Sequence, residues 1–179
     1  MGAGAVGGYF GARLSEGGFD VAFIARGAHL AAIQKSGLRV QSPFGNIKID
    51  SAKATEAPAD VGPVDIVLLM VKLYDVASSA AKIGPLLGPR TAVVALQNGV
   101  DAPQILVDII GSDHVMGGSV YIPAKISEPG VIQHGGGFAK AIFGELDGHR
   151  SERAEDLLHA FQAAMGESEF SDVVEATLW

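Results

Sequence analysis

The sequence has 179 residues, which suits one domain, or one domain and the start of a second, at about 100–200 residues per domain. Hydrophobic residues make up 48% and charged residues 18%, so the composition excludes a disordered chain and provides for an apolar core. A net charge of −7 disfavours extended contact with nucleic acid or an anionic membrane, and the longest apolar run, residues 66–71, is far below the roughly 18 residues of a membrane-spanning helix.

The sequence contains no cysteine. Disulfides, thiolate nucleophiles and Cys-based zinc sites are therefore excluded. The five histidines lack the close spacing of metal ligands, so we expect no metal site. The absence of cysteine fits a cytoplasmic location.

A glycine-rich turn opens the sequence and leads into a predicted helix that ends at Gly17 and Gly18. Residues 21–25 are apolar on both faces, as in a parallel strand that is covered on two sides. A short helix over 30–35 follows. Strands over 38–41 and 46–50 then predict a hairpin, because Gly45 can take the positive φ of the turn.

Two strand and helix units come next. Residues 65–71 carry the strongest pattern of a buried strand and precede a predicted helix over 77–83. Residues 91–96 form a second such strand, after which Asp101 is expected to cap a helix over 103–110. Alternating strands and helices predict a parallel sheet.

After residue 115 the pattern changes to short strands over 115–122, 130–133 and 139–143, separated by turn residues. We expect these strands to pair antiparallel at one sheet edge. Ser151 is expected to cap an amphipathic helix that runs to Met165, and Asp172 a last helix. The predicted fold class is α/β: a Rossmann-type, doubly wound, mostly parallel sheet with antiparallel edge strands.

The glycines at the start have the spacing Gly2-x-Gly4-x-x-Gly7, which is typical of a dinucleotide-binding turn. The first glycine permits the tight turn, the second admits the pyrophosphate to the backbone, and the third allows close packing of helix and strand. The helix N-terminus adds free N–H groups and the positive end of the helix dipole. The alternative is a flexible glycine-rich start. The predicted helix and strand that follow the glycines argue against it.

Arg26 stands at the end of the predicted strand over residues 21–25, about twenty residues after the glycines, where NAD enzymes place an acidic residue on the ribose. A guanidinium can bind a 2′-phosphate with two hydrogen bonds, so this position favours NADP(H) over NAD(H). The alternative is an ordinary surface arginine.

Lys72 and Asn98 follow the next two predicted parallel strands. Ligands of open α/β sheets bind at the carboxyl ends of the strands, so we expect Lys72 to contact cofactor phosphate or ribose and Asn98 to contact cofactor and substrate. The alternatives are a solvated lysine and an Asn-Gly turn. His134, in a turn and without an evident carboxylate partner, is interpreted as structural.

Ser119 and Tyr121 resemble a proton-donor pair, and Lys125 stands four residues after the tyrosine. Pro123 between them argues against the helix that the Tyr-x-x-x-Lys arrangement of short-chain dehydrogenases needs. We therefore reject that interpretation.

Several short motifs stand together in one order. They are Gly2-Ala-Gly-Ala-Val-Gly7, Arg26-Gly27, Val71-Lys72, Leu96-Gln-Asn-Gly99, Pro129-Gly130 with His134 after it, Phe143-Gly-Glu145 and Trp179. Across nearly the whole chain the sequence resembles the N-terminal, NADP-binding domain of the ketopantoate reductase (2-dehydropantoate 2-reductase) family.

The resemblance implies that NADPH delivers a hydride to the keto carbon of 2-dehydropantoate, giving pantoate on the route to coenzyme A. It implies the following cofactor contacts: Gly2, Ala3, Gly4, Ala5, Val6 and Gly7 to the pyrophosphate, Arg26 to the 2′-phosphate, Lys72 to the cofactor, and a backbone contact of Ala124 near the nicotinamide. Asn98 would contact cofactor and substrate as the catalytic residue of this chain. The implied partner is a small 2-oxo acid, and a homodimer is a further expectation.

The sequence departs from the family pattern at both ends. The family begins with a buried strand of about five apolar residues, where only Met1 stands here, and we expect a trimmed or mis-assigned start. The loss of a central strand would expose the edges of its two neighbours. The family's catalytic lysine comes shortly after the tryptophan that matches Trp179, on the way into a helical domain that is absent here.

We therefore expect an NADP-binding Rossmann domain over residues 1–166 and, over 167–179, a connection and a truncated first helix of the missing C-terminal domain. This part of the protein is expected to bind cofactor without reducing a 2-oxo acid. One alternative is a related dehydrogenase acting on another 2-oxo or hydroxy acid. Another is a non-catalytic NADP sensor that binds a partner protein.

Overall fold

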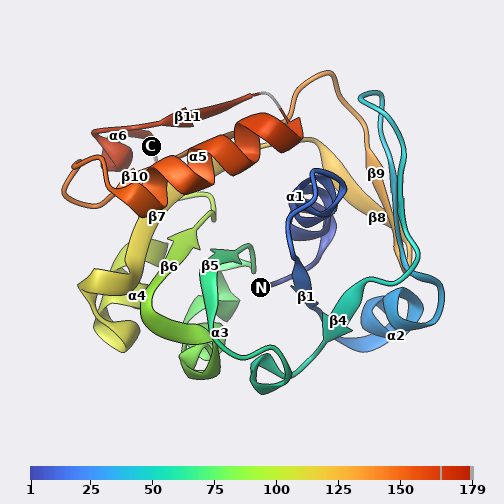
Figure 1. Cartoon of the computed structure of the whole chain (residues 1–179), viewed down its shortest axis with the longest axis horizontal. Helices are drawn as coiled ribbons and strands as arrows, with labels where there is room; N and C mark the ends of the chain where they lie inside the picture. Colours follow the sequence, from blue (N-terminus) through green and yellow to red (C-terminus); the bar gives the residue numbers. More distant parts are fainter. Residues whose placement is uncertain (166, 178–179) are drawn as a thin grey trace.

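The computed structural model describes residues 1–165 and 167–177 and follows the predicted alternation of strands and helices (Figure 1). Its helices are α1 (Ala5–Glu16), α2 (Gly27–Ser36), α3 (Val76–Ala80), α4 (Asp101–Ile110), α5 (Glu152–Met165) and α6 (Val174–Thr177). Its strands are β1 (Ala22–Ile24), β2 (Leu38–Gln41), β3 (Ile47–Ile49), β4 (Lys53–Thr55), β5 (Val64–Leu69), β6 (Leu87–Ala95), β7 (Val115–Tyr121), β8 (Ala124–Glu128), β9 (Val131–His134), β10 (Lys140–Glu145) and β11 (Ser168–Phe170).

The strands form three sheets. The largest has the order β11-β10-β7-β6-β5 and is parallel except for the antiparallel pair β7 and β10. Strands β1 and β4 form a separate parallel pair. The third sheet has the order β3-β2-β9-β8, in which the predicted hairpin of β2 and β3 pairs with β9. The α/β class with a mostly parallel, Rossmann-type sheet is therefore confirmed.

Three sequence expectations need correction. The late strands do not all pair at one edge, because β8 and β9 join the hairpin while β7 and β10 join the main sheet. Asp101 does not cap α4: it is the first helical residue, and Val100 holds the N-cap position. The helix expected over residues 77–83 is shorter, since α3 covers Val76–Ala80 only. Pairing partners and caps depend on contacts that the local pattern does not contain.

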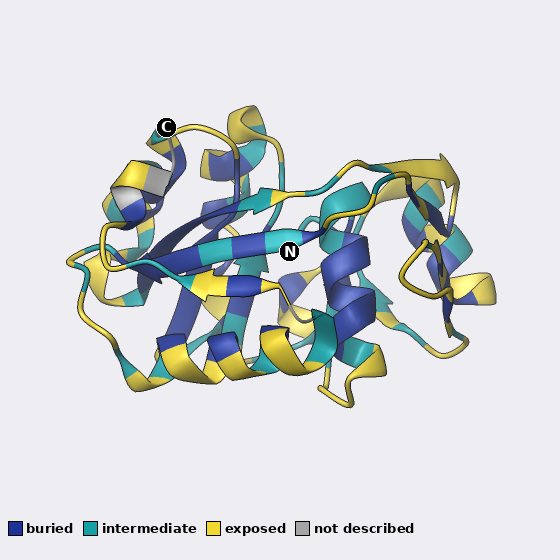
Figure 2. Ribbon diagram, turned by 90° about the horizontal axis from the view of Figure 1, so that it is seen from above, coloured by how far each residue is buried: buried dark blue, intermediate teal, exposed yellow. Residues whose placement is uncertain are grey.

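Helix α1 lies inside the molecule, and its residues 8–14 are all buried (Figure 2). Its Phe10 packs edge-on against Phe161 of α5, with ring centroids 5.8 Å apart, and Phe161 also contacts Phe143 of β10. In contrast, α5 buries one face and exposes the other, as the predicted amphipathic pattern requires. These aromatic contacts join the middle of α1, through α5, to the main sheet.

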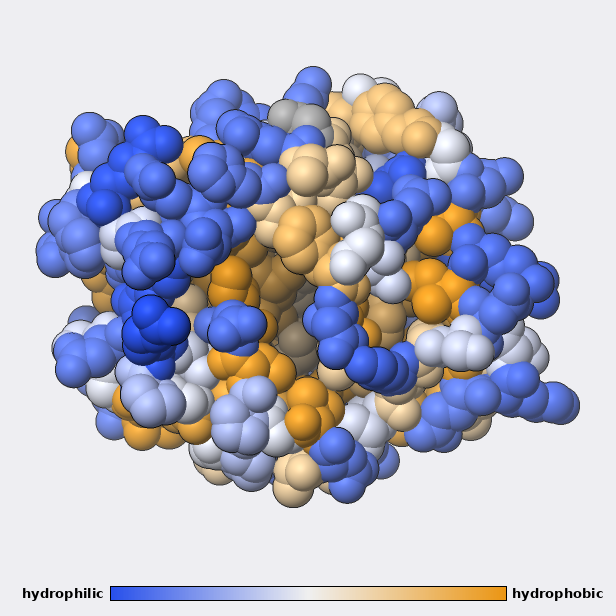
Figure 3. Space-filling model, viewed as in Figure 1, coloured by the Kyte–Doolittle hydropathy of each residue, from blue (hydrophilic) through white to orange (hydrophobic). Residues whose placement is uncertain are grey.

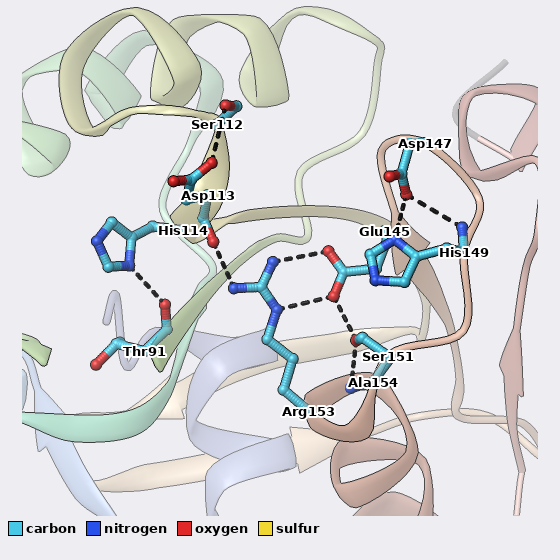
Figure 4. A network of polar contacts seen from close by, with 10 residues as sticks. All are labelled: Thr91, Ser112, Asp113, His114, Glu145, Asp147, His149, Ser151, Arg153 and Ala154. Atoms are coloured by element: carbon cyan, nitrogen blue, oxygen red, sulfur yellow. Dashed lines mark hydrogen bonds and ion pairs between the residues drawn. The ribbon is translucent and has the colours of Figure 1, made fainter. Parts of the chain in front are cut away.

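A polar network fixes the start of α5 (Figure 4). Glu145, 3% exposed, accepts hydrogen bonds from Arg153 at 2.8 and 2.7 Å and from the hydroxyl of Ser151. Burial alone would raise the pKa of Glu145, but the bonds from Arg153 and Ser151 outweigh it, and the net pKa is lowered. Ser151 also accepts from the N–H of Ala154, which confirms the predicted cap.

A gap separates β1 from β5 in the centre of the fold (Figure 1). Within the described residues, β1 pairs with β4 and β5 with β6, and no strand lies between β1 and β5. A cavity of about 420 Å³ lies between them, lined mainly by apolar residues that include Phe23, Ile66 and Leu68. The same face of the molecule shows an apolar hollow with a hydrophilic rim (Figure 3).

Met1 closes one end of this gap. Its amino nitrogen donates to the carbonyl of Leu68 at 2.6 Å, and its carbonyl accepts from the N–H of Met70 at 2.9 Å. The adjacent N–H groups of Gly2 and Ala3 both donate to the carbonyl of Ile24, the last residue of β1. The first three residues thus bridge the carboxyl ends of β1 and β5.

Because burial lowers the pKa of the Met1 amine from 8.0 to about 5, stability should depend on pH. The unfolded amine takes up a proton below pH 8, whereas the folded amine does so only near pH 5. The free energy of unfolding should therefore fall by up to about 4 kcal/mol as the pH is lowered from 8 to 5. Urea titrations across this range measure the effect. An N-terminally acetylated chain is the control; an identical pH dependence in both chains would contradict the assignment to Met1.

None of the helices within residues 1–165 and 167–177 is long and apolar enough to cross a membrane.

Candidate functional site

The glycine-rich loop lies between the carboxyl ends of β1 and β5. Gly2 has a φ of +85°, a conformation that favours glycine, and the N–H of Gly4 donates to its carbonyl at 2.7 Å. Helix α1 then begins at Ala5, with Gly4 at the N-cap. The N–H groups of the first helical turn have no acceptor within the helix and form a potential anion site.

The three glycines of the motif have different surroundings. A Cβ on Gly7 would lie 2.4 Å from the carbonyl oxygen of Gly2, and a Cβ on Gly2 would lie within 3 Å of Val71 and Met70. A Cβ on Gly4 would meet nothing within 4 Å. Gly2 and Gly7 therefore serve the fold of the turn, whereas the missing side chain at Gly4 leaves open space beside the helix N-terminus.

Arg26 and Lys72 lie beyond the carboxyl ends of the two strands that flank this loop. Arg26 follows β1 as the N-cap residue of α2, and its side chain is 76% exposed. Lys72 follows β5, is exposed, and precedes a short 3-10 turn, Leu73–Asp75. Asp75 at the end of this turn accepts a hydrogen bond from Nη2 of Arg26 at 3.0 Å. The sequence patterns did not indicate Asp75, because the partners stand 49 residues apart.

Asn98 follows β6, the next strand of the main sheet, and is exposed. The preceding Gln97 is buried and donates through Nε2 to the carbonyl of Leu69 at the end of β5, while its Oε1 atom has no partner. Gly99 takes a φ of +93°. The buried amide of Gln97 thus ties the two strand ends together and places Asn98 at their shared edge.

Ala124 follows the carboxyl end of β7 and belongs to the third sheet. It begins β8, pairs with His134 of β9 and packs partly buried against the core around α1. His134 is 3% exposed, and both ring nitrogens form hydrogen bonds within the fold, to Ser42 at 2.9 Å and to the carbonyl of Phe138 at 3.0 Å. These contacts agree with the structural interpretation of His134.

The sequence patterns also gave no sign of His29 in α2. Its Nδ1 accepts the N–H of Gly130 at 3.0 Å, so its proton must be on Nε2. Burial lowers the pKa of His29, opposed by a backbone interaction with Ala3 of the glycine-rich loop. His29 thus connects α2 to the turn before β9.

The described residues at this edge suit a dinucleotide. Open space at Gly4 beside N–H groups that have no acceptor within the helix fits a pyrophosphate, and the exposed cation of Arg26 lies beyond the neighbouring strand. This combination of backbone donors, open space and one cation is typical of phosphate recognition in α/β folds.

Comparison with known proteins agrees with this geometry. The family model of ketopantoate reductase PanE/ApbA matches residues 1–148, most of the chain. The chain belongs to the ketopantoate reductase family. This is a family of NAD(P)H-dependent oxidoreductases, and the likeness stated from the sequence motifs is confirmed.

Named relatives of the ketopantoate reductase family cover the whole chain. A 2-dehydropantoate 2-reductase of Mesorhizobium japonicum is 33% identical over all of this chain and 61% of its own length. The crystal structure of 2-dehydropantoate 2-reductase from Porphyromonas gingivalis superposes with a TM-score of 0.90 at 33% identity, covering 97% of this chain and 63% of that one. The chain therefore spans about three fifths of the length of these relatives.

The same fold occurs in a more distant protein. The ternary structure of D-mandelate dehydrogenase with NADH and anilino(oxo)acetate has a TM-score of 0.87 at 22% identity, covering 99% of this chain and 57% of that one.

Proposed function

We propose that this chain is the cofactor-binding part of an NADPH-dependent reductase that converts 2-dehydropantoate to pantoate in coenzyme A biosynthesis. The observation that carries the proposal is the open space at Gly4 beside the N-terminus of α1, between the ends of β1 and β5. Membership of the ketopantoate reductase family and the names of the relatives support this choice of substrate.

The proposed roles follow the geometry of the strand ends. The backbone of residues 2–7 would hold the pyrophosphate, and Arg26 the 2′-phosphate through its guanidinium. Lys72 would neutralise cofactor phosphate, and Asn98 would bind the nicotinamide-side ribose and the substrate. The backbone of Ala124 would lie near the nicotinamide.

Bound NADPH supplies the hydride. The oxygen of the reduced carbonyl then gains negative charge and needs a proton donor or a cation nearby. Asn98 can orient the substrate by donating a hydrogen bond through its amide. By family resemblance the proton donor would be the lysine that follows, in the family, the tryptophan matching Trp179; Trp179 itself lies outside the described residues. A homodimer and a cytoplasmic location stay predictions from the sequence.

Two other functions remain as alternatives. A reductase of another 2-oxo acid is favoured by the anilino(oxo)acetate that accompanies NADH in the D-mandelate dehydrogenase structure, which shares the fold. Steady-state turnover of the full-length protein with a panel of 2-oxo acids separates the two substrates. A non-catalytic NADP sensor would bind the cofactor and turn over none of them.

The cofactor preference can be tested through Arg26. The wild-type chain should bind NADPH about tenfold to a hundredfold more tightly than NADH, because charge-assisted hydrogen bonds contribute roughly 1.5–3 kcal/mol. Arg26→Ala should lose this preference while retaining its affinity for NADH. Calorimetric titration of both cofactors into both proteins provides the measurement. Equal affinities in the wild type would remove Arg26 from the site.

A further inference from the structure

Arg26 has a carboxylate partner, Asp75, at the same edge as the proposed cofactor site. The pair joins the residue after β1 to the turn after β5, across the gap between these strands. The side chain of Arg26 is 76% exposed and that of Asp75 only 24%. The carboxylate is therefore the more enclosed member of the pair, and the guanidinium is open to solvent.

The backbone around Asp75 fixes its position. Its N–H donates to the carbonyl of Lys72 at 2.8 Å, and its carbonyl accepts from the hydroxyl of Ser78 at 3.0 Å. Asp75 stands at the N-cap of α3, where an aspartate often accepts a hydrogen bond from the helix, but its side chain makes no such bond. The carboxylate bonds to Arg26 instead.

We infer that Asp75 is a specificity-determining residue that competes with the 2′-phosphate of NADPH for the guanidinium of Arg26. The inference rests on the proposed role of Arg26. A phosphate monoester carries about −1.5 to −2 charges at pH 7, so it must displace or share a guanidinium that Asp75 already partly neutralises. A bound phosphate is also repelled by the Asp75 carboxylate.

NADH has no 2′-phosphate, so it neither competes with Asp75 for Arg26 nor is repelled there by the Asp75 carboxylate. Its ribose carries a 2′-hydroxyl, which can donate a hydrogen bond to a carboxylate. Asp75 thus reduces the preference that Arg26 alone would give to NADPH. The balance between these two side chains sets how strictly the site selects the phosphorylated cofactor.

Asp75→Asn tests this, because asparagine keeps the size of the side chain and an acceptor oxygen but removes the charge. The variant should bind NADPH about threefold to tenfold more tightly than wild type, the range expected from release of an exposed ion pair and loss of one repulsion. Its affinity for NADH should stay the same or fall. Adenosine 2′,5′-bisphosphate, which carries the 2′-phosphate, should also bind Asp75→Asn more tightly than wild type. 5′-AMP, which lacks it, should not. Neither ligand contains the nicotinamide.

The matched control is Asp156→Asn on the exposed face of α5, which removes one negative charge elsewhere and should change neither affinity. The difference between wild type and Asp75→Asn should also shrink in 1 M salt, where charges are screened within about 3 Å. Thermal melts of each variant verify the fold, and Asp75→Ala should change NADPH affinity in the same direction.

The outcomes separate this inference from the proposed function. If wild type binds NADPH but Asp75→Asn binds it equally or more weakly, the competition is refuted and only this inference fails. If the folded wild type binds neither cofactor, the cofactor-binding proposal fails, and this inference fails with it.

Discussion

Replacing Gly4 with valine should lower the affinity for NADPH by about a hundredfold, roughly 3 kcal/mol, while the fold persists. A Cβ at this position meets no protein atom within 4 Å, and the backbone has a φ of −78°, which any residue adopts. The valine side chain would occupy the space that the pyrophosphate needs. Loss of glycine at the N-cap should cost no more than about 1 kcal/mol of stability.

The matched control is Gly7→Ala. Its Cβ would lie 2.4 Å from the carbonyl oxygen of Gly2, so the turn must deform, and both stability and NADPH binding should decrease. Fluorescence titration with NADPH and thermal melts distinguish the two variants. Wild-type affinity in Gly4→Val would mean that the cofactor does not approach the backbone here.

Filling the gap between β1 and β5 should give the largest change in the free energy of unfolding. We expect an extension of five alternating valine and isoleucine residues, inserted directly before Met1, to pair with both strands and fill the cavity of about 420 Å³. Met1 already bonds to Leu68 and Met70, so an extension that continues backward from it runs parallel to β5 and spans about 16 Å. Burial and new hydrogen bonds, less the ordering entropy, should contribute about 5 kcal/mol.

Such a gain should raise the melting temperature by about 10–20 °C for a chain of this size. The control is an extension of the same length made of serine and glycine, which can pair but cannot fill the apolar cavity. Equal melting temperatures for the two extended chains would show that the cavity does not accept a strand.

The local sequence patterns predicted most of the individual elements. The glycine spacing placed the turn before α1, and the apolar runs placed β5 and β6, because backbone demands and burial act within a few residues. The sequence patterns did not predict β4 (Lys53–Thr55) and β8 (Ala124–Glu128). β4 is only three residues long and pairs with β1, which lies far away in the sequence, whereas β8 forms a local antiparallel hairpin with β9 and is exposed over most of its length.

The sequence predicted individual residues of the candidate site but not the contacts that they make. Arg26, Lys72 and Asn98 could be found because each follows a predicted strand, and parallel strands end at a common edge. The pairing of Arg26 with Asp75, the contact of Gln97 with Leu69 and the position of His29 arise from the tertiary fold. These contacts join residues far apart in the sequence, and no short motif encodes them.

The central claim is that the loop of residues 2–7 holds a dinucleotide phosphate and that Arg26 selects NADP(H). A crystal structure of the chain with NADP⁺ tests it most directly. The pyrophosphate should lie within hydrogen-bond distance of the N–H groups in the first turn of α1, with the 2′-phosphate against the guanidinium of Arg26. A dinucleotide bound elsewhere on the chain, or a 2′-phosphate directed away from Arg26, would contradict the claim.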